Sequence, residues 1–204
     1  MADDLDDLSG LTIIEPNVNW SDTPKTGFDV SFTVEGFDGT LEEVFEFTED
    51  KPEKFQYKIT FKDKAEEKAF LEEWLNYKGR KECFWFVDII DQFTVSQPIG
   101  NTTFTVEVLD NFFVAEGHER IFVKLKNGDR LTRKINSSVA SAGAITLTLN
   151  TAWDRDILID DIEIFTLMYL CRYDTDDQTI TQLNSYVSET NIAILQLVDE
   201  QKAL

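Results

Sequence analysis

The sequence predicts a mainly β fold (α+β), an antiparallel β-sandwich with one flanking helix, and three features of the chain lead to this prediction. Apolar residues alternate with polar ones along most of its length, which is the period of a strand with one buried face. One window, residues 64–78, instead has apolar residues at helical spacing among strong helix formers. Gly, Asn and Asp residues separate the alternating segments, as expected for turns. With 42% hydrophobic residues, the chain can bury a core.

The N-terminal part of the chain is predicted to be an acidic arm followed by a meander. Residues 1–19 are expected to be a flexible arm, because they begin with a run that is rich in aspartate and poor in apolar residues. Three alternating segments then follow in succession, at residues 28–34, 44–48 and 55–61. Strands that follow one another closely usually pair, so we expect an antiparallel meander.

The predicted helix and the strand after it supply the expected structural core. Asp63 is placed to cap the helix N-terminus, and Gly79 to end the helix. The apolar run that follows is too short for a helix and rich in aromatic residues, which indicates a buried strand. Large aromatic residues of the helix and the strand are expected to pack against the same sheet. They are Trp74, Phe84, Trp85 and Phe86.

The central part of the chain contains the clearest hairpin signal. Alternating segments at residues 121–125 and 131–135 flank Asn127-Gly128, a pair that favours a type I′ turn. Several other short strands lie in the same region. Residues 93–160 are therefore expected to form an inserted module, a small β-barrel or sandwich.

The C-terminal strands are expected to complete the main domain. They are predicted at residues 162–173, 179–187 and 192–197. The N-terminal meander and the helix need a covering layer, so we place these strands against them. Residues 20–92 and 161–204 then form the β-sandwich domain, interrupted by the inserted module.

The charge of the chain bears on the partners that it can have. Its 39 Asp and Glu residues against 19 Lys and Arg residues give a formal net charge of -20. A field of that sign repels phosphate backbones and anionic lipid surfaces, so tight nucleic-acid binding is disfavoured. No apolar run approaches the ~20 residues of a membrane-spanning helix, and the acidic N-terminus lacks a signal-peptide pattern. We expect no membrane span and synthesis in the cytoplasm.

The chain has few of the residues that enzymes and metal sites use. Its single histidine, His118, lies in a predicted turn, and Cys83 and Cys171 lack zinc-type spacing. Acidic clusters remain as candidates for acid/base chemistry or calcium binding, at residues 154–156, 160–161 and 174–177. The last is the most like a calcium loop, but it lacks the central glycine and distal glutamate of an EF-hand. We expect a protein that is not an enzyme, with no catalytic residue, no metal site and no cofactor.

The tryptophans leave an alternative open, namely a carbohydrate-binding β module without catalysis. Such a module stacks sugars on exposed aromatic rings. Trp74 and Trp85 are better explained as core residues, because they lie on the predicted inner faces of the helix and the strand. Trp20 and Trp153 lie in predicted loops and could serve as a platform.

Three segments of the chain carry a family resemblance. In residues 70–86 a helix ends at Gly79-Arg80 and a strand with Phe84-Trp85 follows shortly. Residues 112–130 form a predicted hairpin, and residues 170–174 contain an Arg, an aromatic residue and an Asp in that order. In this order the segments resemble those of tail-tip proteins (distal tail or baseplate-type minor tail proteins) of long-tailed bacteriophages and prophages. At residues 87–88 the chain departs from that pattern, which there has a Pro and another aromatic residue.

The resemblance implies a structural virion subunit. Proteins of this kind have β-sandwich cores flanked by a helix and form rings between the tail tube and the tip. The implied assembly is a homo-oligomer, a hexameric ring with a trimer as the alternative. Its implied partners are the tail tube protein and the tail hub and tape-measure proteins, and the ring joins the tube to the hub and the host-recognition parts. The implied location is the tail tip of the virion, after assembly in the host cytoplasm.

Overall fold

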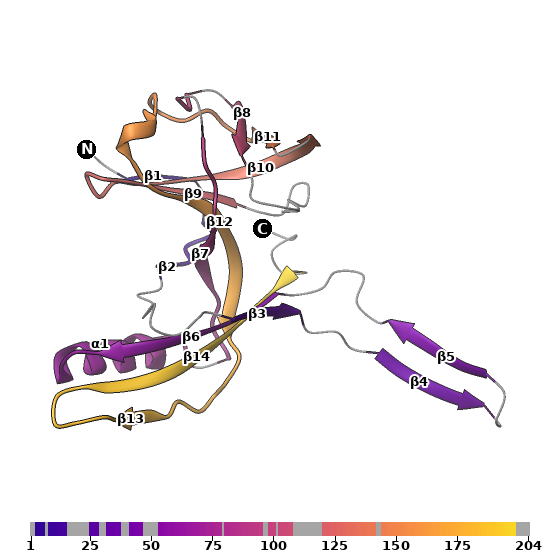
Figure 1. Cartoon of the computed structure of the whole chain (residues 1–204), viewed down its shortest axis with the longest axis vertical. Helices are drawn as coiled ribbons and strands as arrows, with labels where there is room; N and C mark the ends of the chain where they lie inside the picture. The colour runs from indigo at the N-terminus through magenta and orange to yellow at the C-terminus, as the bar shows by residue number, and fades with distance from the viewer. Residues whose placement is uncertain are drawn as a thin grey trace. The chain divides into compact units, whose positions relative to one another are not determined.

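The computed structural model divides the chain into two compact units (Figure 1). Unit 1 contains Met1–Pro16, Phe84–Leu170 and Asp199–Leu204, and unit 2 contains Asn17–Cys83 and Cys171–Val198. The structure describes residues 3–6, 8–15, 25–28, 32–37, 41–46, 53–78, 80–95, 98–100, 102–107, 120–141 and 144–198, and it describes residues 25–28, 32–37 and 41–46 by their backbone alone. Most of these residues lie in strands and one α-helix occurs among them, so the predicted mainly β fold is confirmed.

The strands of unit 1 all belong to one sheet. Strand β12 pairs with β9 and with β7, and the order continues from β9 through β10 and β11 to β8, each pair antiparallel where its register is given. Two short strands add in parallel, β1 to β10 and β2 to β7. The elements are β1 (Asp4–Leu5), β2 (Ile13–Ile14), β7 (Phe84–Gln92), β8 (Thr103–Glu107), β9 (Arg120–Leu125), β10 (Arg130–Ser141), β11 (Ala144–Leu149), the 3-10 helix η1 (Ile159–Asp161) and β12 (Ile162–Tyr173), whose last three residues belong to unit 2.

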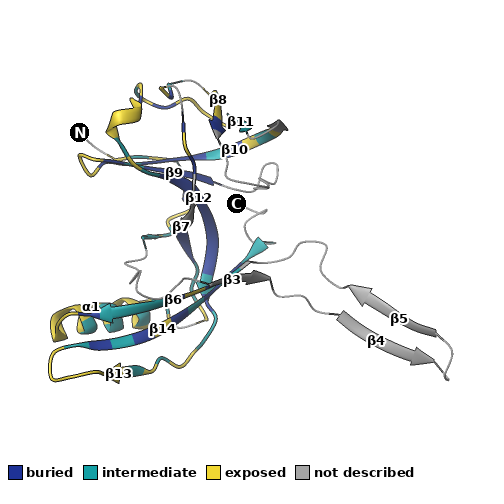
Figure 2. Cartoon of the chain, in the orientation of Figure 1, coloured by how far each residue is buried: buried dark blue, intermediate teal, exposed yellow. Residues whose placement is uncertain are grey.

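The core of unit 1 lies around β7, β9 and β12. Figure 2 shows β9 and most of β12 as buried. Consecutive residues of these strands are buried, which means that both faces of each strand are covered. Strand β11 instead alternates between buried and half-buried residues, as the sequence pattern predicts. In β7, Phe84, Trp85 and Phe86 are at most 1% exposed.

The start of the chain differs from the expected flexible arm. Strand β1 lies on β10, with Asp4 opposite Leu131 and Leu5 opposite Thr132. Further along, the Trp85 N–H donates to the Thr12 carbonyl oxygen at 2.9 Å, next to the β2–β7 pair. An acidic segment is expected to be mobile only when no basic surface binds it. Here basic residues of unit 1 form such a surface.

The turn between β9 and β10 differs in type from the prediction. A type I′ turn needs a positive φ at both central residues, but Asn127 is not among the non-glycine residues with positive φ. The Gly128 N–H donates to the Leu125 carbonyl oxygen at 2.8 Å, and Gly128 has φ +92. The Leu125 N–H then donates to the Asp129 carbonyl oxygen at 2.9 Å. The loop therefore has three residues, a tight turn followed by a left-handed glycine.

Unit 2 consists of a four-stranded sheet region, a separate hairpin and the helix. Strand β6 lies between β3 and β14, and β13 pairs with β14. Strands β4 and β5 pair with each other in a two-stranded sheet. The elements are β3 (Lys25–Phe28), β4 (Phe32–Phe37), β5 (Leu41–Glu46), β6 (Glu53–Phe61), α1 (Lys64–Asn76), β13 (Ile180–Gln182) and β14 (Ser188–Gln196).

The expected N-terminal meander is wrong in its pairing. Strand β6 does not follow β5 in a sheet but pairs with β3 on one side and with β14 on the other. A period of two tells which face of a strand is buried and not which strand lies beside it. The C-terminal β14 does lie against this N-terminal strand, as placed from the sequence, and Phe55 of β6 sits opposite Ile194.

The helix lies against β6 with a partly exposed surface. Asp63 caps it as predicted, since its carboxylate accepts from the N–H groups of Ala65 and Glu66 at 2.8 and 2.9 Å. The helix ends at Asn76, two residues before the predicted end, because Lys78 adopts φ +52. No residue of α1 is fully buried (Figure 2), so Trp74 is half-buried instead of a core residue.

The compact units also differ in their boundaries from the expected domains. Strand β7 and the first nine residues of β12 belong to unit 1, with most of the expected inserted module. The pairing of β7 with β12 explains this, because the two strands share one core with β9.

Candidate functional site

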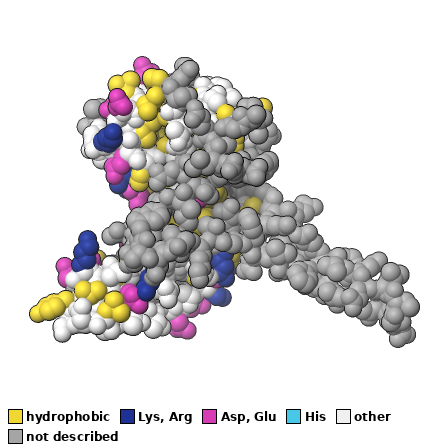
Figure 3. All heavy atoms as spheres, viewed as in Figure 1, with side chains coloured by type: hydrophobic (Ala, Val, Ile, Leu, Met, Phe, Trp, Pro, Cys, Tyr) yellow, Lys and Arg dark blue, Asp and Glu magenta, His cyan; other side chains and the backbone are white. Residues whose placement is uncertain are grey.

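A cluster of charged residues in unit 1 holds the N-terminal segment, residues 3–6 and 8–15. Three arginines of β9 and β10 form what we call the arginine cluster, and each pairs with a different aspartate of the segment. Figure 3 shows acidic and basic side chains next to each other on the described surface of unit 1. The pairs are Arg120 with Asp6, Arg130 with Asp3, and Arg133 with Asp4.

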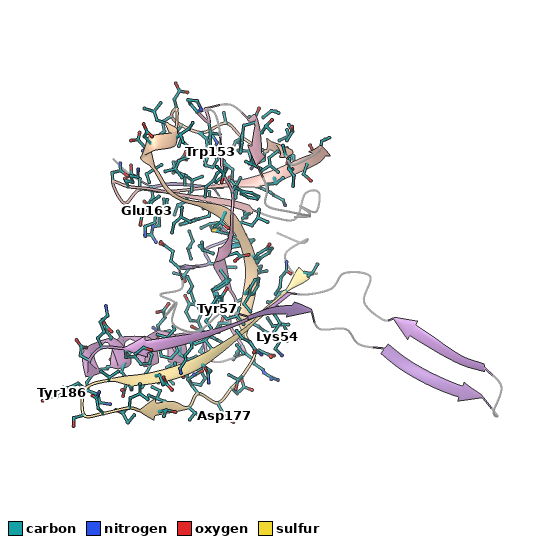
Figure 4. All side chains as sticks on the ribbon, in the orientation of Figure 1. Lys54, Tyr57, Trp153, Glu163, Asp177 and Tyr186 are labelled. Atoms are coloured by element: carbon teal, nitrogen blue, oxygen red, sulfur yellow. The ribbon has the colours of Figure 1, made fainter. Side chains whose placement is uncertain are left out.

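Arg133, on β10, is 5% exposed and has several partners. Its guanidinium donates to the carbonyl oxygens of Ala152, Thr132 and Asp4 at 3.1, 2.7 and 3.2 Å. It also donates to the Asp4 carboxylate, and it lies 5.0 Å from the centroid of the ring of Trp153, which Figure 4 labels. A buried guanidinium is tolerated when its charge is neutralised and its N–H groups are bonded, and both conditions are met here.

Arg120, on β9, is buried to the same extent on the other side of the strand pair. It lies 5.0 Å from the centroid of the Trp85 ring and donates to the Asp6 carboxylate at 3.2 Å. The same carboxylate accepts the Lys134 N–H at 3.2 Å. In the ladder Arg120 lies opposite Lys134, one position from Arg133, so the two arginines point to opposite faces. The segment therefore binds both faces of β9 and β10.

The outer part of the cluster is more exposed. The Arg130 N–H donates to the Asp3 carboxylate at 2.9 Å, and the Arg130 guanidinium lies 3.6 Å from Glu15. Glu15 also accepts a hydrogen bond from Lys124 at 2.9 Å, which raises the pKa of Lys124. Exposed pairs of this kind each add little stability, so their main effect is to fix the position of the segment.

The segment is also attached by its backbone and by one apolar side chain. The Asp6 N–H donates to the Thr132 hydroxyl at 3.0 Å. Leu8 is 9% exposed, and its carbonyl oxygen accepts the Trp85 indole N–H at 3.3 Å. The remaining described residues of the segment are half-buried or exposed. Charge pairs and hydrogen bonds thus outweigh apolar burial in holding it.

Our sequence reasoning missed the arginine cluster, although one signal for it was present. Arg133 lies between Leu131 and Ile135 in an alternating strand, at a position where the pattern calls for an apolar residue. A charged residue at a core position needs an opposite charge, and the acidic start of the chain is the obvious source. The two features lie far apart in the sequence, so nothing in the sequence links them.

Two of the acidic candidates in unit 1 are contacted by basic residues, Asp154 through its carboxylate and residues 160–161 through their backbone. The Asp154 carboxylate accepts hydrogen bonds from Arg155 at 2.6 and 2.7 Å, which lower the pKa of Asp154. The Asp160 carbonyl oxygen accepts from the Lys126 side chain at 2.6 Å, and the Asp161 carbonyl oxygen from the Lys126 N–H at 2.8 Å. These contacts attach the loop before β12 to the turn at Asn127-Gly128.

The acidic candidate in unit 2, residues 174–177, is contacted by two basic side chains. Lys54, which Figure 4 labels, pairs with the Asp174 carboxylate, and the Arg80 guanidinium lies 3.7 Å from that carboxylate. The Arg80 side chain also donates to the Asp174 carbonyl oxygen at 2.7 Å, and the Arg80 N–H to the Asp176 carboxylate at 3.0 Å. The two cations offset the charge of Asp174, and Arg80 holds the turn through both Asp174 and Asp176.

Unit 2 contains a second polar cluster, centred on Glu67 of α1. Its carboxylate accepts hydrogen bonds from Lys64, Ser188 and Gln182 at 2.7, 2.5 and 3.0 Å. These bonds, with Lys64 first, lower the pKa of Glu67 from 4.5 to about 2. The cluster links the first turn of the helix to β13 and β14.

Glu67→Gln is expected to lower the Tm at neutral pH, because the amide loses charge-assisted hydrogen bonds. The folded-state pKa lies below the unfolded one, so the stabilisation is complete above about pH 4.5 and is lost as the pH falls through about 2. Thermal unfolding followed by circular dichroism from pH 7 downward should show the difference from the parent shrinking below about pH 4.5.

Glu72→Gln is the matched control for this experiment. Glu72 lies on the same helix and forms a loose ion pair with Lys68, at 3.5 Å with both side chains exposed. Its Tm should stay near that of the parent at each pH. A Glu67→Gln difference that is constant with pH would contradict the role given to the Glu67 carboxylate.

Two of the tryptophans considered for sugar binding are buried. Trp85 and Trp153 are 1% and 6% exposed, and each is covered by an arginine of the cluster. Neither ring has a free face for a sugar. Trp20 lies outside the described residues, as does His118.

Within the described ranges, no group of three or more His, Cys, Asp or Glu residues is placed to hold a metal ion. In the same part of the chain, no helix has the length and apolar character needed to cross a membrane. The chain matches no protein-family model and no curated protein sequence.

Proposed function

We propose that this chain is a non-enzymatic structural subunit of a bacteriophage tail tip. Copies of it assemble into a closed ring, most simply a hexamer, that joins the tail tube to the central hub. The tail tube, hub and tape-measure proteins are its partners in this proposal, and the tail tip of the virion is its location. The proposal rests on the resemblance of residues 70–86, 112–130 and 170–174 to tail-tip proteins and on one feature of the fold.

The feature that carries the proposal is the β4–β5 hairpin of unit 2. Its register runs from Phe32 opposite Glu46 to Phe37 opposite Leu41. Within the described part of the chain, β4 and β5 pair only with each other. An isolated two-stranded hairpin is at best marginally stable in water, and its outer edges offer unpaired backbone groups. Neighbouring copies in a ring would pair these edges and close the assembly without open-ended growth.

The charge of this region fits a ring through which DNA passes. Residues 26–50 contain eight Asp and Glu residues and no Lys or Arg. A wall of that sign repels the phosphate backbone, so DNA would move past it without sticking. The same charge makes apposed copies repel one another, and salt shortens the range of that repulsion.

We assign the ring contacts to the β-sandwich domain that includes unit 2, and we assign the central strands of unit 1 to the inserted β module. The sugar-binding alternative has less support, because the rings of Trp85 and Trp153 are covered.

The proposal predicts that self-association strengthens with salt and needs the hairpin. Light scattering and negative-stain imaging across a salt series should show monomers at low salt and closed rings at high salt, or rings once tail-tube and hub proteins are co-expressed. Replacing residues 32–46 by a short Gly-Ser linker should abolish the rings, because it removes β4 and β5 and keeps β3 and β6.

The control is the fold of the shortened variant, which should give a circular dichroism spectrum and Tm near those of the parent. Persistent monomers of the parent in every condition, with no co-purifying tail component, would contradict the proposal. Genomic neighbours offer an independent check, since a tape-measure gene should precede this one and a hub or fibre gene should follow it.

A further inference from the structure

The N-terminal segment is covalently connected to the strands that bind it only by way of unit 2. The segment belongs to unit 1, but the chain then enters unit 2 and returns to unit 1 at Phe84. Its hydrogen bonds join Leu8 to Trp85, 77 positions away, and Asp4 to Asp154, 150 positions away. Every copy of the chain offers the same binding surface, so the covalent connection does not dictate which copy receives the segment.

The contacts of the segment are of a kind that two copies can exchange. Strands β1 and β2 have two residues each, and Leu8 is the buried apolar anchor among its described residues. Release therefore exposes little apolar surface and leaves charges that water solvates. The same bonds re-form on a second copy, so exchange leaves the total number of contacts unchanged.

A short connection joins the segment to the first strand of unit 2. Residues 16–24 separate Glu15 from β3 in the sequence. Nine residues span at most about 30 Å when extended. In a ring, the adjacent copy is held at high effective concentration, which favours a contact between chains over one within a chain.

The charges identify a second copy as the recipient. The segment is acidic and the arginine cluster is basic, and three aspartates match three arginines in the described geometry. A chain of net charge -20 has few basic surfaces to offer another acidic chain, and this cluster is one that fits its own N-terminus.

We infer that the N-terminal segment is exchanged between copies in the assembled ring, so that the aspartates of one copy bind the arginine cluster of the next. The inference rests on the proposed self-assembly. Exchange turns a contact within one copy into a contact between two copies. This charge-complementary contact counteracts the net repulsion between copies, which otherwise opposes the ring.

Disulfide trapping between two single variants tests the inference. Asp3→Cys is placed in one chain and Arg130→Cys in another of different mass, both in a Cys83→Ser background that leaves Cys171 buried. Asp3 and Arg130 are hydrogen-bonded neighbours and partly exposed, so each change is mild. In ring-forming conditions, a mixed dimer on a non-reducing gel is expected as the main cross-linked product.

Two controls make the result decisive. Asp3→Cys mixed with Thr105→Cys, an exposed position on β8, should give only background cross-linking. The double variant with both cysteines in one chain should form an internal disulfide when the protein is monomeric. If imaging shows rings and the mixed dimer stays at background, the segment remains on its own chain and the inference is wrong, while the proposed function stands. If no condition yields rings, both are wrong.

Discussion

Trp85→Ala is expected to lower the free energy of unfolding by ~3–5 kcal/mol, as truncation of a buried large aromatic side chain usually does. Trp85 is 1% exposed, its indole N–H donates to the Leu8 carbonyl oxygen, and its ring supports Arg120. Alanine leaves a cavity beside β7, takes the indole donor from the Leu8 carbonyl and removes the ring from Arg120. Chemical denaturation with a two-state fit measures the loss.

Trp74→Ala is the matched control, because it removes the same side chain from a half-buried position on α1. Its loss should be less than half of that for Trp85→Ala, since less apolar surface returns to water. A Trp85→Ala variant within experimental error of the parent, or an equal loss for the two variants, would contradict the burial that distinguishes β7 from α1.

The elements that the sequence predicts well are those whose signal is local. Strand β12 has the predicted bounds, Ile162–Tyr173, because a long apolar run between turn residues leaves few alternatives. Strand β11 buries Ile145, Leu147 and Leu149 on one face, as the alternation requires. The cap at Asp63 likewise depends on residues within one turn of the helix.

The features that the sequence does not reveal depend on partners far along the chain. Alternation places a residue on a face but does not choose the neighbouring strand, so the pairing of β6 with β3 and β14 could not be read from it. The hairpin at Asn127-Gly128 was located correctly, yet its turn type follows from one extra residue in the loop. The arginine cluster joins residues more than a hundred positions apart.

The arginine cluster also predicts a large effect on stability. Arg133→Met is expected to lower the free energy of unfolding by about 2–4 kcal/mol, because it breaks a mostly buried ion pair and removes hydrogen bonds to the carbonyl oxygens of Ala152 and Thr132. Methionine keeps the apolar stem over the Trp153 ring, so the change tests the charge more than the packing. Denaturation of the full chain measures the effect.

Arg130→Met is the control for this change, because Arg130 pairs with the same segment from a 40% exposed position. Its loss should stay below about 1 kcal/mol.

Hydrogen exchange gives a second readout: in Arg133→Met the amides of the N-terminal segment should lose protection before the rest of unit 1, since Arg133 binds both the backbone and the carboxylate of Asp4. Asp4→Asn should reproduce this local loss with a smaller global one, because it leaves the bonds of Arg133 to Ala152 and Thr132 intact. If Arg133→Met leaves the segment as protected as in the parent, the segment is held by Leu8 and the backbone ladders, and the charge pairs do not control its attachment.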